Sequence, residues 1–575
     1  MPPPTIVELR PDRRFMDINF EGYKLNLNPL PHWVRTLSTP VDRVYPDEVQ
    51  YSFVHAKLFA LHNHLVPDLW DHGFTFYYVD SKQQVRRIAF DSDSHVIEEK
   101  VVYDIPAHVQ RAPGHFNLSV SFPNATNAFI SDGTGYLHVA ITGIRGYNSD
   151  GAWKTLLSDL VLDGKYFVIV DSRAQPKDEK IVLNALLLSV DHDESHFFSV
   201  LTWVTYEEDN DVWKQTSFRQ LSGKGVVHYA AIETSFEGVY ISSDNPFKFI
   251  VDSVKEIEED PKPTEPVKVI YTWLQTMDDV TITIKLPENY QKSLFHVNVE
   301  PMFVKISYAG TPFIEGKLFD HVDTELTTWD IEPEGNVDIL LTKTDSRMWE
   351  EFIEGGDPSG EQIMDPSLVE DAHRKLAHLC SETELAVEAP PPAVAMQELE
   401  ECDAGSEDTI LARYDINLHK TTHRTPLSVH QILFHLPLHV GDAPAVALRH
   451  EVDACVWQPY PKLLVRDSWP LKHVGTLKAF GYIQSSKQNK KFVTCAPDCS
   501  YSVVCESSRH ILIYRDKGSP ETTLRHRNGG NSRNVSLGQQ NVLNTDKYGE
   551  ILGIYAANNY LFLLAKNTFI AIELM

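Results

Sequence analysis

Residues 120–140 read VSFPNATNAFISDGTGYLHVA and contain a pattern that recurs along the chain. A short strand leads to a polar turn and then to a second strand of apolar residues, Phe129 and Ile130 among them. The tight turn Asp132-Gly133-Thr134-Gly135 then leads into a third strand with alternating polarity. Glycine tolerates the positive φ angles that such hairpin turns demand. The stretch therefore predicts an antiparallel meander of three strands.

The same order of strands and turns recurs at residues 231–251, 495–515 and 555–573 and, in a weaker form, at residues 74–90. Repeated meanders are typical of β-propellers, whose blades bury their faces against one another. The two ends of the chain together supply about 430 residues, enough for about seven blades of roughly 40–45 residues with their loops. The predicted fold class is all-β, a WD-repeat-like propeller whose last strand, Thr568–Glu573, closes the ring near the N-terminal strands. Two unrelated β-sandwiches are the alternative.

Two polar, proline-bearing stretches divide the chain, KEIEEDPKPTEP at residues 255–266 and residues 382–408. Such segments bury too little apolar surface to offset the entropy of ordering and are typical of linkers. The sequence thus predicts five parts: residues 1–255, the first half of the propeller; 256–266, a linker; 267–357, a β-sandwich; 358–408, a helix and linker; and 409–575, the second half of the propeller.

Local patterns support the middle parts of this division. Val280, Ile282, Ile284 and Leu286 alternate with polar residues, which is typical of a strand with one buried face. Further on, Ser367 and Glu370 form an S-x-x-E capping box, the start of a predicted helix. Its apolar stripe consists of Leu368, Ala372, Leu376 and Leu379.

Composition excludes several classes of protein. The 80 acidic and 52 basic side chains give a net charge of -28, which opposes broad binding to nucleic acid or anionic lipid. No secretory leader or bilayer-spanning apolar stretch is visible, so we expect a cytoplasmic protein, with the nucleus as an additional location. Six cysteines are too few for a disulfide scaffold and fit a reducing compartment.

Signatures of enzymes and of metal sites are missing or weak. The chain has no G-x-x-x-x-G-K-[ST], no G-x-S-x-G and no G-x-G-x-x-G between a strand and a helix. We therefore expect no catalytic residue, cofactor or metal. The nearest candidates for zinc, Cys495, Cys499, Cys505 and His510, are better explained as buried thiols in strands and a neighbouring histidine. The other weak candidates are two histidines in a predicted turn, His192 and His196, and a basic stretch predicted to be a solvated loop, Arg525, Arg527 and Arg533.

The middle part resembles the CS domain of the NudC family, an α-crystallin-like sandwich found in co-chaperones. The resemblance rests on Tyr271-Thr-Trp273-Leu-Gln275, on DDVTITIKLP at residues 278–287, and on Thr328-Trp329 and Trp349. Motifs in both flanks, such as FEGYKL at residues 20–25 and Trp457-Gln-Pro459, extend the resemblance to the family over nearly the whole chain.

This resemblance implies a co-chaperone-like protein that associates with the heat-shock protein 90 chaperone system. It also implies clients that are β-propellers or members of multiprotein complexes, and a link to the dynein-associated nuclear-distribution pathway. The chain shows no heptad run, so no coiled-coil dimer is expected. We therefore expect a non-enzymatic adaptor whose CS domain contacts the chaperone system while the propeller binds a client. A pure interaction scaffold is the alternative, and a propeller enzyme is a weaker one.

Candidate protein-binding residues lie in the CS-like part. They are Tyr271, Trp273, Gln275, Lys285, Lys305, Lys317 and Trp349. Tryptophan is enriched at binding hot spots, yet it also fills sandwich cores, and both readings stay open for Trp273 and Trp349. Trp329 alternates with Ile331, which predicts a core position. The three lysines stand out in an acidic chain and suit an acidic partner, although solvated lysines that protect edge strands are the alternative.

Overall fold

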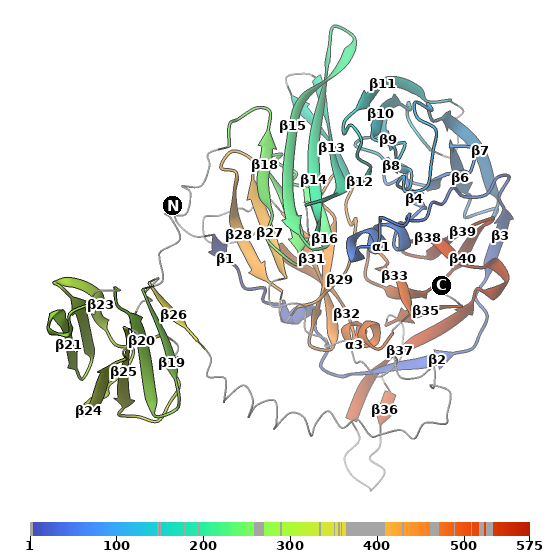
Figure 1. Ribbon diagram of the computed structural model, residues 1–575. Helices are drawn as coiled ribbons and strands as arrows, with labels where there is room; N and C mark the ends of the chain where they lie inside the picture. Colours follow the sequence, from blue (N-terminus) through green and yellow to red (C-terminus); the bar gives the residue numbers. More distant parts are fainter. Residues whose placement is uncertain are drawn as a thin grey trace, which may run out of the picture. The chain divides into compact units, whose positions relative to one another are not determined.

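The structure, a computed structural model, describes most of the chain (Figure 1). The described residues are 4–574 apart from 147, 148, 150, 178–179, 194–195, 258–269, 288–289, 333–334, 350, 355–356, 358, 364–408, 428–429, 461–470, 488, 508, 517–521 and 525–532. They form two compact units, one of residues 1–258 with 399–575 and the other of residues 259–398. The predicted helix at Ser367–Leu379 and the loop residues Arg525 and Arg527 lie outside the described residues.

The first unit consists of seven β-sheets, which we number as blades 1 to 7 in chain order. Blade 1 is β4 (Val66–Pro67), β5 (Phe74–Val79), β6 (Gln84–Phe90) and β7 (Ile97–Asp104). Blade 2 is β8 (Ser119–Ser121), β9 (Asn127–Ser131), β10 (Tyr136–Ile141) and β11 (Lys154–Leu160). Blade 3 is β12 (Phe167–Lys177), β13 (Lys180–His192), β14 (Phe197–Asp209), β15 (Val212–Lys224) and β18 (Lys248–Asp252).

Three of the other four blades, blades 4, 6 and 7, carry an N-terminal strand on their outer edge. Blade 4 is β16 (Val227–Ile232), β17 (Gly238–Ser243), β27 (Ile410–Asp415), β28 (Lys420–Pro426) and β1 (Thr5–Ile6). Blade 5 is β29 (Ile432–Leu436), β30 (Ala445–His450), β31 (Asp453–Pro459) and β32 (Leu471–Leu477). Blade 6 is β33 (Lys490–Cys495), β34 (Tyr501–Glu506), β35 (His510–Arg515), β37 (Arg533–Asn544) with the short β36 (Thr522–Leu524), and β2 (Phe20–Asn26). Blade 7 is β38 (Ile551–Ala556), β39 (Tyr560–Ala565), β40 (Thr568–Glu573) and β3 (His32–Thr36).

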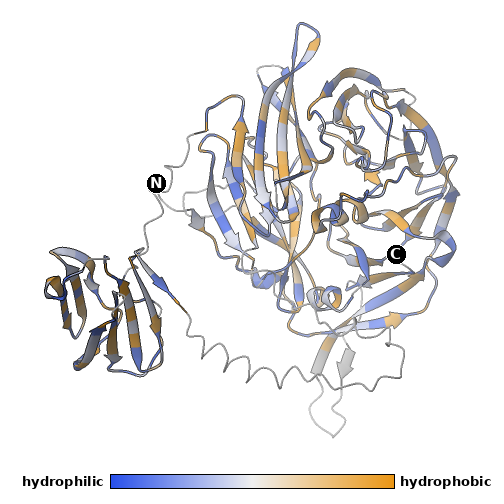
Figure 2. Ribbon diagram, in the orientation of Figure 1, coloured by the Kyte–Doolittle hydropathy of each residue, from blue (hydrophilic) through white to orange (hydrophobic). Residues whose placement is uncertain are grey.

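Seven apolar clusters join the described parts of these blades into a closed ring. Each cluster lies between two neighbouring blades, in the order 1–2, 2–3, 3–4, 4–5, 5–6, 6–7 and 7–1. Between blades 7 and 1, for example, the rings of Phe76 and Phe562 lie 4.5 Å apart. Figure 2 shows hydrophobic residues along the strands of the ring, and the central strands β9, β17 and β39 are buried over their whole length. The predicted split propeller of about seven blades is confirmed.

The last strand closes the ring, as the sequence predicted. β40 pairs antiparallel with β3, from His32 opposite Ile572 to Thr36 opposite Thr568. The first 36 residues also reach the three preceding blades, and we call residues 5–36 the N-terminal strap. β1 pairs parallel with β28 and β2 pairs parallel with β37. Between them, the amide of Asp12 donates to Nδ1 of His473 at 2.9 Å in blade 5.

Blade 4 contains strands from both halves of the chain. β17 pairs with β27 over all six residues, from Gly238 opposite Asp415 to Ser243 opposite Ile410. The predicted continuous meander over residues 231–251 is therefore wrong in its third strand, because β18 pairs with β15 of blade 3 instead. The place beside β17 is taken by β27, which offers a six-residue ladder and the buried side chains of Leu411 and Tyr414.

Two short helices complete the described part of the ring. Helix α1 (Phe53–Ala60) begins at the N-cap Ser52, whose Oγ accepts from the amide of His55 at 3.2 Å. Figure 1 shows this helix in the middle of the ring. Helix α3 (Phe480–Ser485) lies against blade 5. Neither helix is long enough to cross a lipid bilayer.

The second unit is a sandwich of two sheets. One sheet has the order β24 (Val322–Ile331), β25 (Asn336–Lys343), β20 (Asp279–Lys285), β19 (Tyr271–Gln275) and β26 (Gly360–Gln362). The other consists of β21 (Phe295–Glu300), β22 (Phe303–Tyr308) and β23 (Thr311–Lys317). The alternation predicted for residues 280–286 is confirmed, since Val280, Ile282 and Ile284 are buried between the sheets.

Candidate interaction sites

The aromatic residues of β19 build the core of the sandwich. Tyr271 and Trp273 are both buried, and both rings contact the ring of Phe352 at centroid distances of 5.9 and 5.8 Å. The hydroxyl of Tyr271 donates to Oδ2 of Asp357 at 3.0 Å. This hydrogen bond holds the segment between β25 and β26 against β19. A buried aromatic ring that also finds a polar partner stabilises a small sandwich efficiently.

Gln275, Lys343 and Trp349 form a buried polar clamp. Oε1 of Gln275 accepts from Nζ of Lys343 and from the amide of Trp349, both at 2.8 Å, and its Nε2 donates to the carbonyl of Trp349 at 2.8 Å. Nζ of Lys343 also donates to the carbonyls of Thr276 at 2.7 Å and Arg347 at 2.8 Å. Burial lowers the pKa of Lys343, against the opposing charges of Asp278 and Asp279. The clamp therefore holds the loop after β25 against β19.

The burial of these side chains corrects the sequence-based assignment. Tyr271, Trp273, Gln275 and Trp349 were candidates for partner binding, with a core position left open for Trp273 and Trp349, and all four side chains lie inside the sandwich. They hold the module together and do not form a surface that another protein can touch. The buried Lys343, the last residue of β25, was missed as a candidate.

Trp329 departs from the sequence prediction in the opposite sense. It lies opposite Ile339 and so points to the core side, but its side chain is 38% exposed, and the predicted core position is wrong. The reason is that β24 is an edge strand, where the three-stranded facing sheet gives little cover. The ring contacts Phe295 at 5.5 Å, and Nζ of Lys292 lies 5.6 Å from the ring centroid.

The three candidate lysines do not share one surface. Lys305 forms an ion pair with Glu315 at 2.8 Å on the outer face of the three-stranded sheet, and Lys317 of the same sheet pairs with Glu354. Lys285 is exposed on the outer face of the five-stranded sheet and has no ion pair with any described residue. Of the three, Lys285 is the one whose charge is not already matched within the described parts of the chain.

The outer face of the five-stranded sheet has the character of a binding surface. A row of side chains runs across four strands, with Leu274 opposite Thr281, Thr281 opposite Leu340, and Leu340 opposite Thr328. Leu340 is 37% exposed, and Lys285 lies on the same face of β20. We call Leu274, Thr281, Lys285, Thr328 and Leu340 the outer sheet face. The same face also carries the carboxylates of Asp279, Asp330 and Asp338, and this mixture of aliphatic, hydroxyl and charged groups suits contact with another protein.

The propeller exposes an aromatic segment just before α1. Tyr45, Val49, Tyr51 and Phe53 are all exposed, Tyr51 to 81% and Phe53 to 74%. The ring of Tyr51 packs edge-on against Phe197, the first residue of β14, with ring centroids 5.5 Å apart. Exposed aromatic groups gathered on a rigid support are typical of protein-binding sites. Nothing in the sequence pointed to this segment, because it contains neither a repeat nor a motif.

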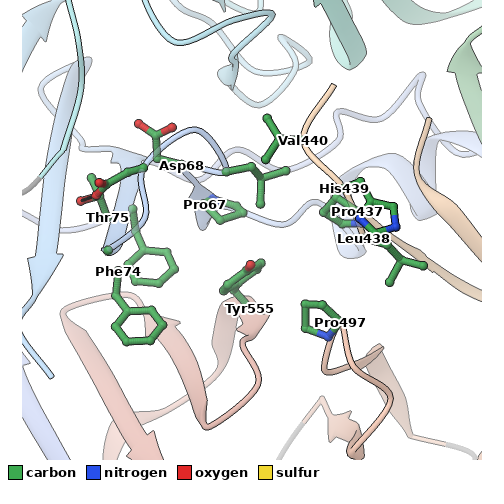
Figure 3. Close-up of a pocket in the computed structure, with 14 residues that line it drawn as sticks. Pro67, Asp68, Phe74, Thr75, Pro437, Leu438, His439, Val440, Pro497 and Tyr555 are labelled. Carbon is green, nitrogen blue, oxygen red and sulfur yellow. Dashed lines mark hydrogen bonds between the residues drawn. The ribbon is translucent and has the colours of Figure 1, made fainter. Parts of the chain in front are cut away.

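The propeller is hollowed next to the connection between β29 and β30. A pocket there has a volume of about 190 Å³. Figure 3 shows Pro437, Leu438, His439 and Val440 on one side of it, with Pro67 of blade 1 and Tyr555 of blade 7. Beyond the pocket, the guanidinium of Arg173 in blade 3 donates to the carbonyls of Gly441 at 2.6 Å and Asp442 at 2.9 Å. A loop of blade 5 is thus fastened to blade 3, across the inner strands of the ring.

The weak candidates for metal binding occupy ordinary structural positions. Cys495 faces blade 5 whereas Cys505 faces blade 7, so the two thiols lie on opposite faces of blade 6. His192 and His196 lie at the hairpin between β13 and β14, as predicted. The described residues contain no group of three or more His, Cys, Asp or Glu side chains placed to hold a metal ion.

The Asp132–Gly135 stretch forms the predicted hairpin turn between β9 and β10. Oδ1 of Asp132 accepts from the amides of Thr134 at 2.8 Å and Tyr136 at 3.2 Å, and Gly133 and Gly135 have φ angles of 71° and 110°. The carboxylate is thus used to hold the turn.

Comparisons with known proteins agree with this architecture. The CS domain family matches residues 269–343. NudC domain-containing protein 1 of Mus musculus is 34% identical over 579 residues, covering 98% of each chain, and that of Xenopus tropicalis is 35% identical over 574 residues, covering 97% of this chain and 96% of the other. The chain belongs to the NudC domain-containing protein 1 family. The predicted relationship is thereby confirmed.

Members of this family share the whole arrangement and not the CS domain alone, because the alignments run through both halves of the propeller. Among solved structures, a nuclear movement protein from E. cuniculi GB-M1 is similar to part of this chain, with 23% sequence identity and a TM-score of 0.14. The match covers 15% of this chain and 98% of the other. The assignment of the propeller rests instead on the order of its sheets.

Proposed function

We propose that this protein is a non-enzymatic adaptor of the co-chaperone type. The observation that carries the proposal is that one chain folds into two separately cored bodies, a closed ring and a CS sandwich. An adaptor that holds two proteins raises the concentration of one near the other, with no chemical step. The protein would work in the cytoplasm and in the nucleus.

The CS sandwich would contact the heat-shock protein 90 chaperone system through its outer sheet face. This face combines the half-exposed Leu340 with Lys285, and no described acidic side chain pairs with that lysine. The opposite sheet is less suited, since Lys305 and Lys317 are engaged by Glu315 and Glu354. Because the charge of Lys285 is unmatched, it offers a contact for an acidic group of a partner, beside the carboxylates of Asp330 and Asp338 on the same face.

The propeller would bind the client through the aromatic segment before α1. Tyr51 and Phe53 offer large apolar areas on side chains with few rotatable bonds, which are the properties of binding hot spots. We expect the client to be a β-propeller protein or a member of a multiprotein complex. The client-binding and chaperone-binding surfaces then belong to different units of the chain.

Affinity recovery from cell extract, read by mass spectrometry, tests both contacts. Lys285→Glu should reduce recovery of the chaperone at least fivefold, whereas the matched charge reversal Lys305→Glu on the other sheet should not. The double substitution Tyr51→Ser/Phe53→Ser should reduce client recovery and spare the chaperone, with Val212→Ser, an exposed residue of blade 3, as control. Equal chaperone recovery with Lys285→Glu and wild type would contradict the proposed CS contact. Unchanged client solubility after depletion of the protein would favour a pure scaffold.

A further inference from the structure

The propeller encloses a central cavity of about 510 Å³. One strand from each blade lines it, namely β4, β8, β12, β16, β29, β33 and β38, and α1 with residues 61–64 lies along one side. Most of the lining is aliphatic, with Val54, Val120, Val168 and Ile169 among its residues. Apolar walls lower the effective dielectric beside them, so a charge next to them acts more strongly than in water.

The titratable groups that line this cavity are all basic apart from two tyrosines. They are Lys57, His62, His64, His228, His435 and Lys491. No carboxylate occurs among the described residues that line the cavity, although the chain has a net charge of -28. The two lysines carry positive charges that favour an anion locally, and the four imidazoles offer N–H donors.

These groups gather at two places. At the first, Nζ of Lys57 donates to Nδ1 of His228 at 2.9 Å, and Nε2 of His228 in turn donates to Oδ1 of Asp244 at 2.6 Å. Lys57 has no further hydrogen-bond partner among the described residues. Its charge also reaches His435 of blade 5. Lys57 therefore keeps N–H donors free for a ligand.

At the second place, the rings of His62 and His64 lie 4.6 Å apart, and both are within electrostatic reach of Lys491 of blade 6. Nζ of Lys491 donates to Oε1 of Glu550 at 2.7 Å, and Glu550 also pairs with Arg43 behind the cavity wall. Three cations, Lys57, Lys491 and Arg43, thus face two carboxylates, Asp244 and Glu550.

Burial acts on the protonation of these groups. Burial, helped by the charge of Lys491, lowers the pKa of His62 to about 4. Burial also lowers the pKa of His64 well below its usual value, and the charges of His62, Lys491 and Arg43 lower it further. Burial likewise lowers the pKa of Lys57 to about 8, although the carboxylate of Asp244 opposes this shift. Burial also lowers the pKa of His435. An anion in the cavity would reverse this effect, because a nearby negative charge favours the protonated forms.

We propose that the central cavity binds a small polyanion with at least two phosphate groups, one received at Lys57 and His228 and the other at His62, His64 and Lys491. Phosphate oxygens accept several hydrogen bonds from lysine and imidazole N–H groups, which suits two donor groups that line one cavity. The aliphatic lining between them can accommodate the body of an organic ligand.

Isothermal titration calorimetry of the full chain with sodium tripolyphosphate tests the proposal. At pH 7 and fixed ionic strength, wild type should bind the probe at a single site, and Lys57→Met should weaken binding at least tenfold. Lys57→Arg should restore most of the affinity, and Lys305→Met on the CS sandwich should leave it unchanged. Repeating the titration in two buffers with different ionisation enthalpies should reveal proton uptake on binding.

The pH dependence follows from the same groups. Lys57 is protonated below pH 8, so affinity should be full near pH 7 and should fall as the pH rises through 8. Melting temperatures of all variants without the probe show whether they fold. No saturable binding by wild type, equal binding by wild type and a folded Lys57→Met, or equal weakening by Lys305→Met would each overturn the proposal.

Discussion

Replacement of Arg413 by methionine tests how the two halves of the chain are joined inside blade 4. Nε and Nη2 of Arg413 donate to the two carboxylate oxygens of Glu233 at 2.9 and 2.7 Å, and Nη1 donates to Asp415 at 3.0 Å and to Thr422 at 3.1 Å. Glu233 precedes the inserted CS domain and Arg413 follows it. Both side chains are almost completely buried.

The expected cost can be worked from this geometry. Arg413→Met leaves the carboxylate of Glu233 buried with only the hydroxyls of Tyr240 and Ser235 as side-chain partners among the described residues. Removing one partner of a buried ion pair costs about 3–5 kcal/mol of unfolding free energy. The double substitution Glu233→Leu/Arg413→Met removes both charges and should recover most of this loss, because apolar replacements of a buried pair are often neutral.

Acid should reduce the difference in free energy of unfolding between wild type and Arg413→Met. Burial opposes the ionisation of Glu233, but the hydrogen bonds and charge of Arg413 outweigh it and lower the pKa of Glu233 below its usual 4.5. A carboxyl whose pKa is lower in the folded state stabilises the fold above its unfolded pKa and loses that contribution as the pH falls through the folded value. The advantage of wild type should therefore be full near pH 7 and should shrink below pH 4.5.

Urea unfolding followed by hydrogen exchange and mass spectrometry separates the two units, because peptides of the ring and of the sandwich are read independently. Ring peptides of Arg413→Met should lose protection at lower urea, and sandwich peptides should not change. A loss below about 1 kcal/mol, near the value of an exposed ion pair, would refute the reasoning. So would a double variant that is no more stable than the single one.

Three further predictions concern local structure. Gly133→Ala should lower the melting temperature of the ring by more than Gly164→Ala. Both residues have positive φ angles, but a Cβ at residue 133 would lie 2.2 Å from the carbonyl oxygen of Phe116, whereas a Cβ at residue 164 would meet open space. Equal shifts in melting temperature would show that the close approach at residue 133 is unimportant. Gln275→Leu should destabilise the CS sandwich alone by about 1–3 kcal/mol, as seen by the same exchange experiment, because Lys343 and the backbone of Trp349 lose hydrogen bonds. Burial raises the pKa of Cys455 and of Cys505 to about 12, so iodoacetamide at pH 8 should alkylate them far more slowly in the native protein than in urea, and equal rates would contradict their burial.

The parts of the fold that the sequence revealed are those with local causes. The Asp132–Gly135 turn follows from one carboxylate and two glycines, and the strand at residues 280–286 follows from simple alternation. Closure by Thr568–Glu573 could be inferred because a propeller needs a partner for its last blade.

Features that depend on distant parts of the chain were not visible in the sequence. Trp329 has the alternation of a core residue, yet its exposure depends on how far the facing sheet extends. Lys343 carries a charge that normally seeks water, and only the three acceptors around its Nζ explain its burial. The third strand of the 231–251 meander was misassigned because its competitor, β27, lies beyond the inserted domain.

The N-terminal strap has a consequence for biosynthesis. Its strands are synthesised long before the segments with which they pair, β28, β37 and β40. Until then the nascent chain carries unpaired edges at both sides of an incomplete arc, and such edges invite aggregation. A protein built in this way depends on shielding by cellular folding factors during its own production.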